Sequence, residues 1–321
     1  MRRYVIRRLL QLIPILIGIT LLSFGMMHLA GGDAVTALLE NQGVAVTQEV
    51  IDAKKHELGL DQPFMVQYLN WFRGLVTGNM GTSFVTGKDV FQTFASKLPA
   101  TILLTLTSII ATVVVALPLG IVAATRQNKF VDYLIRVLSF VGNSLPNFFV
   151  ALLLIFVFAI VLGWLPVISA NIGKTGVAAI SWAGLVLPTA TLAIAMASKY
   201  TRQIRATVLD ELSKPYVEGA RARGVSESRI LTKSVLKSVM IMLVTLLALS
   251  IGDLLGGTAI VETIFQWDGV GKLAVDSIVM RDYPMIQAYV VWMAIIYVMV
   301  NLAADLLYHY LDPRVRLGGD E

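Results

Sequence analysis

The sequence has no cysteine, very little histidine and little charge. Its 321 residues include three His and 15% charged residues, whereas an average soluble domain has about 25% charged residues. The absence of cysteine excludes disulfide scaffolds, thiol nucleophiles, iron–sulfur clusters and cysteine-based zinc sites. His28, His56 and His309 lie in different segments without metal-ligand spacing, so no metal site is predicted. Hydrophobic residues make up 56% and the mean hydropathy is +0.75, which together predict a multi-spanning membrane protein.

Catalytic motifs are also lacking. A phosphate-binding loop needs Gly-x4-Gly-Lys-Ser/Thr, but residues 81–89 have the wrong spacing and no hydroxyl residue directly after Lys88. Gly269-Val270-Gly271-Lys272 fails for the same reasons. We find no nucleophile elbow and no pair of carboxylates suited to acid–base chemistry. The chain is therefore not expected to be an enzyme, and any uphill transport must be driven by an ion gradient or by another subunit.

Six apolar runs approach the length of about 20 residues that a helix needs to cross a bilayer. They are Leu9–Ala30, Ala100–Ala124, Val137–Leu162, Ala183–Ser198, Val239–Val261 and Met285–Ala304. The fourth run is short. The first exceeds the apolar core of about 7 to 15 residues in a cleaved signal peptide, the competing interpretation, so we expect a retained anchor. Prolines within four of the runs (Pro14, Pro118, Pro146 and Pro188) predict kinks, which membrane helices tolerate.

The distribution of positive charge predicts the orientation. Of the 26 Lys and Arg residues, 18 fall in the N-terminal arm, the segments 125–136 and 199–238, and the C-terminal tail. Short loops rich in Lys and Arg stay in the cytoplasm, so both termini are predicted to be cytoplasmic, which six spans satisfy. The net charge of +5 therefore reflects membrane topology and predicts no binding to nucleic acid.

The segment 199–238 carries signals for a short helix. Ser213 is a predicted cap, Pro215 suits the first helical position and Gly224 suits a C-terminal stop, so a helix is expected over residues 215–223. Its predicted apolar side comprises Tyr216, Val217 and Ala220, with Glu218, Arg221 and Arg223 available for polar contacts. A second helix is expected to start at Ser226 and continue into the fifth span. From pattern alone, this hairpin could also lie on the lipid headgroups.

The residues Tyr-Val-Glu-Gly-Ala-Arg-Ala-Arg-Gly at 216–224 resemble the "EAA" loop of binding-protein-dependent ABC importer permeases of the peptide/nickel family. The resemblance extends over nearly the whole chain through further landmarks in the same order. These are the arginine-rich start, Gly59–Pro63, Gly78–Ser83, Leu98–Thr101, Pro146–Phe148, Glu262–Phe265, Gly269–Gly271, Arg281–Pro284 and Asp312–Arg316.

The resemblance implies an all-α integral membrane protein with the six-helix type I ABC importer transmembrane domain, an N-terminal helix and a large extracytoplasmic loop. It implies a bacterial cytoplasmic (inner) membrane, a homologous second permease, two ABC ATPase subunits that bind ATP and magnesium, and an extracytoplasmic substrate-binding protein. This chain itself would hold no cofactor. The expected divisions are an anchor helix at 1–30, an extracytoplasmic region at 31–93, the transmembrane domain at 94–311 with the coupling loop 199–238, and a tail at 312–321.

In the family the short EAA helix docks on the ATPase. The resemblance therefore assigns ATPase coupling to residues on or beside the predicted helix, namely Tyr216, Glu218, Gly219, Ala220, Arg221 and Gly224. Gly219 stands where the family more often has alanine or threonine, and this weakens the helix by about 1 kcal/mol.

Polar groups in or next to the spans are candidates for the translocation pathway, because they are costly in a membrane. They are Asn143, Asn147, Asp253 and Glu262. Close helix packing is an alternative use of the segment around Asp253, where Gly252 and Gly256 form a small-x3-small motif.

Three residues on predicted outer segments, Trp71, Trp267 and Asp268, are candidates for contact with the binding protein. Anchoring of the tryptophans at the membrane interface is the alternative. The family transports di- and oligopeptides, nickel chelates and related small molecules, and the short Gly163–Trp182 loop is more similar to the nickel-type members. A self-sufficient secondary carrier or channel is the rival function, but six spans without an evident repeat favour a permease with a separate ATPase.

Overall fold

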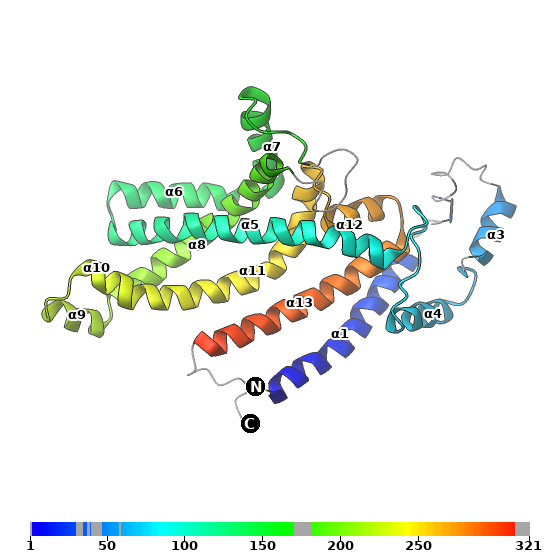
Figure 1. Cartoon of the computed structure of the whole chain (residues 1–321), viewed down its shortest axis with the longest axis horizontal. Helices are drawn as coiled ribbons and strands as arrows, with labels where there is room; N and C mark the ends of the chain where they lie inside the picture. Colours follow the sequence, from blue (N-terminus) through cyan, green and yellow to red (C-terminus); the bar gives the residue numbers. More distant parts are fainter. Residues whose placement is uncertain are drawn as a thin grey trace.

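The computed structural model describes residues 2–29, 35–36, 39, 47–57, 59–169 and 181–311; these are helical apart from turns and one isolated β-bridge between Thr82 and Asp89. The long helices are α1 (Arg2–Leu29), α5 (Val90–Thr125), α8 (Trp182–Leu212), α11 (Leu236–Ile264) and α13 (Tyr283–Leu311). The shorter elements are α3 (Gln48–Glu57), α4 (Phe64–Val76), α6 (Phe130–Ser144), α7 (Asn147–Leu154), α9 (Pro215–Ala222), α10 (Glu227–Ile230), α12 (Val270–Val279) and the π-helices η1 (Ile155–Val161) and η3 (Leu231–Val235). Helices α9 and α10 lie at one end of the long axis, and α3 and α4 lie at the other (Figure 1).

The described residues contain five helices that are long and apolar enough to cross a membrane, or six spans if α6 and the α7–η1 segment count as one bent span. The five helices are α1, α5, α8, α11 and α13, with α11 continuing the shorter segments α10 and η3. Each predicted apolar run overlaps one of these spans. The prediction of an all-α integral membrane chain is confirmed.

The third predicted span is broken rather than kinked. The chain turns by 106° between Phe130–Ser144 and Asn147–Val161. Leu145 has extended backbone, with ψ of 132°, because a residue that precedes proline is driven out of the helical region. Pro146 is also extended, with ψ of 142°. Pro14, Pro118 and Pro188, in contrast, lie inside continuous helices. Only Pro146 of these four therefore ends a helix.

Helix α8 corrects the predicted start of the loop at residue 199. The apolar run ends at Ser198, but the helix continues to Leu212. Tyr200, Ile204 and Val208 follow one another at a spacing of four residues and are completely buried, which places them on one face of the helix. Packing of this face stabilises the helix beyond the apolar run, so a helical segment replaces the first part of the predicted loop.

Helices α5 and α8 form the centre of the molecule and approach each other closely. A Cβ atom on Gly120 of α5 would lie only 2.6 Å from Cγ2 of Ile204 on α8, so a larger residue there would force the helices apart. Buried side chains from α5 and α8 contribute to two hydrophobic clusters, one with α7 and α11 and the other with α9, α10 and α11. These two clusters fix both ends of the bundle relative to the central pair.

Helix α1 lies beside α13 on one side of this centre (Figure 1). The Tyr4 hydroxyl of α1 donates to Asp305 Oδ2 of α13 at 2.6 Å, and Arg8 Nη2 lies 3.1 Å from the same oxygen. Most of the apolar side chains of α1 remain exposed, for example Leu22 at 66%. The N-terminal helix therefore offers an apolar surface to lipid or to another membrane subunit.

Candidate functional site

The hairpin formed by the end of α8, by α9 and by α10 is built from local signals. Lys214 has extended backbone and precedes Pro215, which occupies the first turn of α9, where its missing N–H costs nothing. Gly224 ends the helix with φ of +76°, a conformation that favours glycine. The predicted helix at 215–223 is therefore present within one residue. Ser213, however, ends α8 and does not cap α9.

One buried side chain anchors α9 to the bundle. Val217 is completely buried and belongs to a hydrophobic cluster that includes Val208 of α8 and Ile230 of α10. Burial of a valine contributes about 1.5 kcal/mol or more. Glu218, Arg221 and the following residues up to Gly224 are exposed. The short helix thus has one face fixed by its own chain and one face available to a partner.

Charged and polar groups hold α9 at both ends. Glu211 of α8 accepts hydrogen bonds from Lys214 Nζ at 2.6 Å and from the Tyr216 hydroxyl at 2.8 Å. At the other end, Arg221 donates through Nε and Nη2 to the two carboxylate oxygens of Glu227 at 2.6 and 3.1 Å. This pairing raises the pKa of the Arg221 guanidinium. These contacts attach α9 to the end of α8 at one side and to α10 at the other.

Tyr216 is positioned differently from the prediction. It was expected on the apolar side with Val217, but its side chain is 44% exposed and its hydroxyl reaches back to Glu211. Partial burial, followed by the hydrogen bond to Glu211, raises the pKa of Tyr216 to about 12. The phenol therefore stays protonated and remains a donor throughout the physiological range.

A second polar centre lies near the C-terminal end of α11, whereas α10 and η3 precede the start of this helix. Glu262 is completely buried, and its Oε1 accepts from the Thr101 hydroxyl at 2.7 Å while its Oε2 accepts from the backbone N–H of Lys272 at 2.8 Å. Cβ atoms on Gly269 and Gly271 would lie 2.5 and 2.9 Å from Oε2. The glycines at these positions therefore leave the space that the carboxylate occupies.

The residues next to Glu262 reinforce this corner between α5, α11 and α12. Trp267 is 1% exposed and donates from Nε1 to the carbonyl of Ala100 at 3.1 Å. Asp268 forms an ion pair with Lys97 at the start of α5. In this structure Glu262 and Trp267 are enclosed by their own chain. The predicted contact of Glu262 with the pathway, and of Trp267 and Asp268 with the binding protein, stay predictions.

Of the three remaining pathway candidates, two have side chains that the structure describes. Asn143 is exposed near the end of α6 and Asn147 is partly exposed at the start of α7, so they flank the break at Pro146. Asp253 lies in α11, but its side chain is outside the described residues. The role of these three residues in translocation also stays a prediction.

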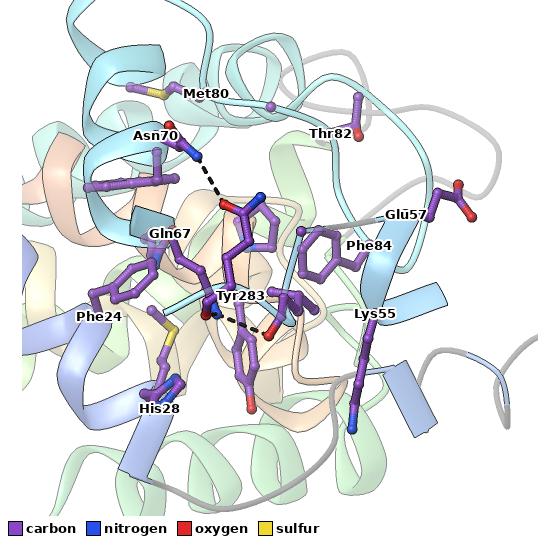
Figure 2. A pocket seen from close by; sticks show the side chains of 18 residues that line it. Phe24, His28, Lys55, Glu57, Gln67, Asn70, Met80, Thr82, Phe84 and Tyr283 are labelled. Atoms are coloured by element: carbon purple, nitrogen blue, oxygen red, sulfur yellow. Dashed lines mark hydrogen bonds between the residues drawn. The ribbon is translucent and has the colours of Figure 1, made fainter. Parts of the chain in front are cut away.

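Trp71 lines a cavity at the end of the molecule opposite α9. The cavity has a volume of about 710 Å³, and it lies between α1, α4, the 80–84 segment and the start of α13. Figure 2 shows Phe24, Gln67 and Tyr283 converging on it from three different helices. Gln287 also lines it; its side chain is 6% exposed and makes no hydrogen bond to the described residues. The cavity thus combines aromatic rings with carboxamide groups.

Comparisons with known proteins agree with this architecture. The sequence model described as "Binding-protein-dependent transport system inner membrane component" matches residues 116–317, and its N-terminal companion, "Binding-prot-dependent transport system membrane comp, N-term", matches residues 1–105. The chain belongs to this family. The family assignment makes it a permease subunit of an ATP-driven importer and a multi-pass membrane protein, not an enzyme, because ATP is hydrolysed by separate subunits. The rival interpretation as a self-sufficient carrier or channel is therefore wrong.

Curated relatives match the permease over almost its full length. The glutathione transport system permease protein GsiC of Salmonella typhimurium strain LT2 is 39% identical over 98% of this chain and 99% of its own. The same protein of Escherichia coli strain K12 is 38% identical with the same coverage. Inward-facing structures of the MetNI methionine ABC transporter share the fold, with a TM-score of 0.55, 18% identity, and coverage of 69% of this chain and 97% of that chain. The type I importer fold is confirmed.

The family assignment implies an ATPase, a binding protein and a second permease as partners of this permease. Within the chain, the hairpin around α9 is the described element that combines the EAA resemblance with an exposed face on a rigid support. Sequence reasoning found α9 but missed Glu211 and Glu227, which fix it. The only local signal for them is that each carboxylate lies within six residues of the basic or phenolic group it binds.

Replacement of Gly219 by alanine is expected to stabilise the permease. A Cβ atom at Gly219 would meet only the Arg223 guanidinium, at 3.4 Å, and alanine favours a helix over glycine by about 1 kcal/mol. We expect Gly219→Ala to raise the thermal unfolding midpoint of the purified permease in detergent. Gly224→Ala is the contrasting variant, because φ of +76° disfavours alanine; stabilisation by both variants, or by neither, would contradict the prediction.

Proposed function

We propose that the permease imports short peptides of about the size of glutathione, which it receives from an extracytoplasmic binding protein. The support is the full-length similarity to permeases named for glutathione transport. These relatives favour the peptide alternative over the nickel alternative that the short Gly163–Trp182 loop had indicated. Residues 170–180 of that loop lie outside the described part of the chain, so its length is the only basis for the nickel alternative.

The observation that carries the coupling proposal is the geometry of α9. Its exposed residues, among them Glu218 and Arg221, face away from the bundle, while Val217 and the Glu211 and Glu227 contacts hold it rigidly. A rigid helix transmits a displacement at its exposed face directly to α8 and α11. We infer that α9 docks on one of two ABC ATPase subunits and that Tyr216, Gly219, Ala220 and Gly224 support this contact.

The orientation of the chain in the membrane is inferred from the end of the molecule that carries α9. The basic segments 125–136 and 199–238 lie at the ends of α5 and α8 near α9, and short basic loops stay in the cytoplasm. We infer that α9 and both termini are cytoplasmic and that the cavity beside Trp71 faces the outside. Its aromatic and carboxamide groups suit contact with the surface of the binding protein. A second, homologous permease would complete the pathway.

The substrate is tested with the binding protein and the assembled transporter. Calorimetry of the binding protein should show saturable binding of glutathione or of another di- to tetrapeptide, and proteoliposomes with all subunits should take up that peptide when ATP is supplied. A nickel chelate serves as the alternative ligand. Binding of the chelate but not of peptides would overturn the substrate proposal, and uptake by this chain alone would overturn the subunit arrangement.

The pathway candidates are tested in the same proteoliposomes. We propose that Asn143, Asn147 and Asp253 line the route, because polar groups in spans are retained where they contact water or substrate. Asp253→Asn should reduce uptake at limiting substrate. Unchanged uptake would exclude a direct role for Asp253 and favour its contribution to helix packing.

A further inference from the structure

A groove between α6 and α8 has a composition that the transport function does not explain. It has a volume of about 470 Å³ and is lined by Tyr133, Arg136, Val137, Phe140, Arg202 and Arg205. The first four residues occupy positions i, i+3, i+4 and i+7 of α6 and so share one face of that helix. The last two lie one turn apart on α8. We call this cavity the α6–α8 groove.

One guanidinium of the groove is held in place by a buried carboxylate. Arg205 donates from Nε to Asp132 Oδ1 at 2.7 Å and from Nη2 to Asp132 Oδ2 at 2.8 Å. Asp132 is completely buried, and its Oδ2 also accepts from the backbone N–H of Asn128 at 3.0 Å. Arg205 is therefore a rigid part of the groove wall whose charge is already balanced.

The other two guanidinium groups have no such partner. Among the described residues, neither Arg136 nor Arg202 forms an ion pair, and both side chains are exposed. Arg136 lies over the ring of Tyr133 at 5.4 Å, a contact that orients the guanidinium without neutralising it. With Asp132 balancing Arg205, the groove carries two uncompensated positive charges and is complementary to an anion.

The arginines continue directly into an apolar surface. Val137 and Phe140, on the same face of α6, are 59% and 65% exposed. Helix α6 follows the end of the membrane-spanning helix α5 after a turn of four residues, so the arginines lie near a membrane face and the apolar residues extend from there along the helix. An anion alone would leave Val137 and Phe140 uncovered. An amphiphile with an anionic head satisfies both parts of the groove.

We propose that the α6–α8 groove binds one anionic phospholipid. Its phosphate lies between Arg136 and Arg202, and an acyl chain follows Val137 and Phe140. Basic pockets between membrane helices are suited to such headgroups. This site does not depend on the identity of the transported substrate or on the docking of α9.

Lipid binding is measured on the full chain, purified in a mild detergent, by native mass spectrometry. The probe is dioleoylphosphatidylglycerol, and dioleoylphosphatidylcholine is the uncharged match. Replacement of Arg136 and Arg202 together by glutamine should weaken binding of the anionic lipid by about 20- to 30-fold, because each basic group near a membrane surface contributes about fivefold. Replacement of both by lysine should retain most of the binding.

The matched control replaces Arg126 and Lys129 by glutamine. These residues precede α6, carry the same charge and do not line the groove. The control should weaken binding by less than about threefold, because exposed charges outside the site are screened. Phe140→Ser tests the acyl contact without a change of charge and should also weaken binding. This variant still tests the proposal if the arginine variant fails to fold.

Several outcomes would overturn the proposal. Equal loss in the control variant would show general charge attraction, and equal affinity for phosphatidylcholine would show binding without a role for the headgroup charge. Displacement of the lipid by inorganic phosphate at the same concentration would identify a free-phosphate site. Unchanged binding in both the arginine variant and Phe140→Ser would place the lipid elsewhere.

Discussion

Replacement of Glu218 by arginine is expected to uncouple the permease from its ATPase. Glu218 is exposed on α9, next to Val217, which fixes the helix to the bundle. Loss of a central interface residue costs about 2 kcal/mol or more, equivalent to about 30-fold in affinity. Co-purification of the ATPase with Glu218→Arg should fall by at least this factor, and substrate-stimulated ATP hydrolysis and uptake should fall with it.

The control for this variant is Glu49→Arg. Glu49 is an exposed acidic residue on α3, at the other end of the long axis (Figure 1). Charge reversal at an exposed position changes the free energy of unfolding by about 0.5 kcal/mol or less, so both variants should insert in the membrane and unfold like the parent chain. If Glu218→Arg retains the ATPase, or if Glu49→Arg loses it as well, α9 is not the specific docking element.

The short helix α9 was predictable because its signals are local. Pro215 and Gly224 act on their own backbone, and the helix lies between them as expected. The extension of α8 was missed because the apolar run ends at Ser198. The buried positions Tyr200, Ile204 and Val208 continue at a spacing of four, and this amphipathic pattern is the sequence signal for the longer helix.

The break at Pro146 and the Glu262 corner depend on contacts that the sequence does not specify. Four prolines occur in predicted spans, and their local sequences do not show that Pro146 alone ends a helix. Glu262 was recognised as a costly polar group, but its partner Thr101 is 161 residues away in the chain. Only tertiary packing reveals that Gly269 and Gly271 make room for this carboxylate.

Replacement of Glu262 by alanine is expected to destabilise the permease more than any exposed substitution. The change would leave the Thr101 hydroxyl and the Lys272 N–H without their acceptor in a site from which water is excluded. Unsatisfied buried donors cost about 1 to 3 kcal/mol each, and a cavity would remain as well, so we expect a loss of about 3 to 5 kcal/mol. Thermal unfolding of the purified chain in detergent measures this effect.

The matched control is Asp276→Ala on the neighbouring helix α12. Asp276 accepts from Lys272 Nζ at 2.6 Å, but its side chain is 42% exposed, and such ion pairs contribute about 1 kcal/mol or less. The two substitutions each remove a carboxylate that is bonded to Lys272, one buried and one exposed. A midpoint for Glu262→Ala equal to that of Asp276→Ala would show that the corner is not held by the buried carboxylate. A lower midpoint with normal transport by the folded fraction would assign Glu262 to the architecture of the permease and remove it from the pathway.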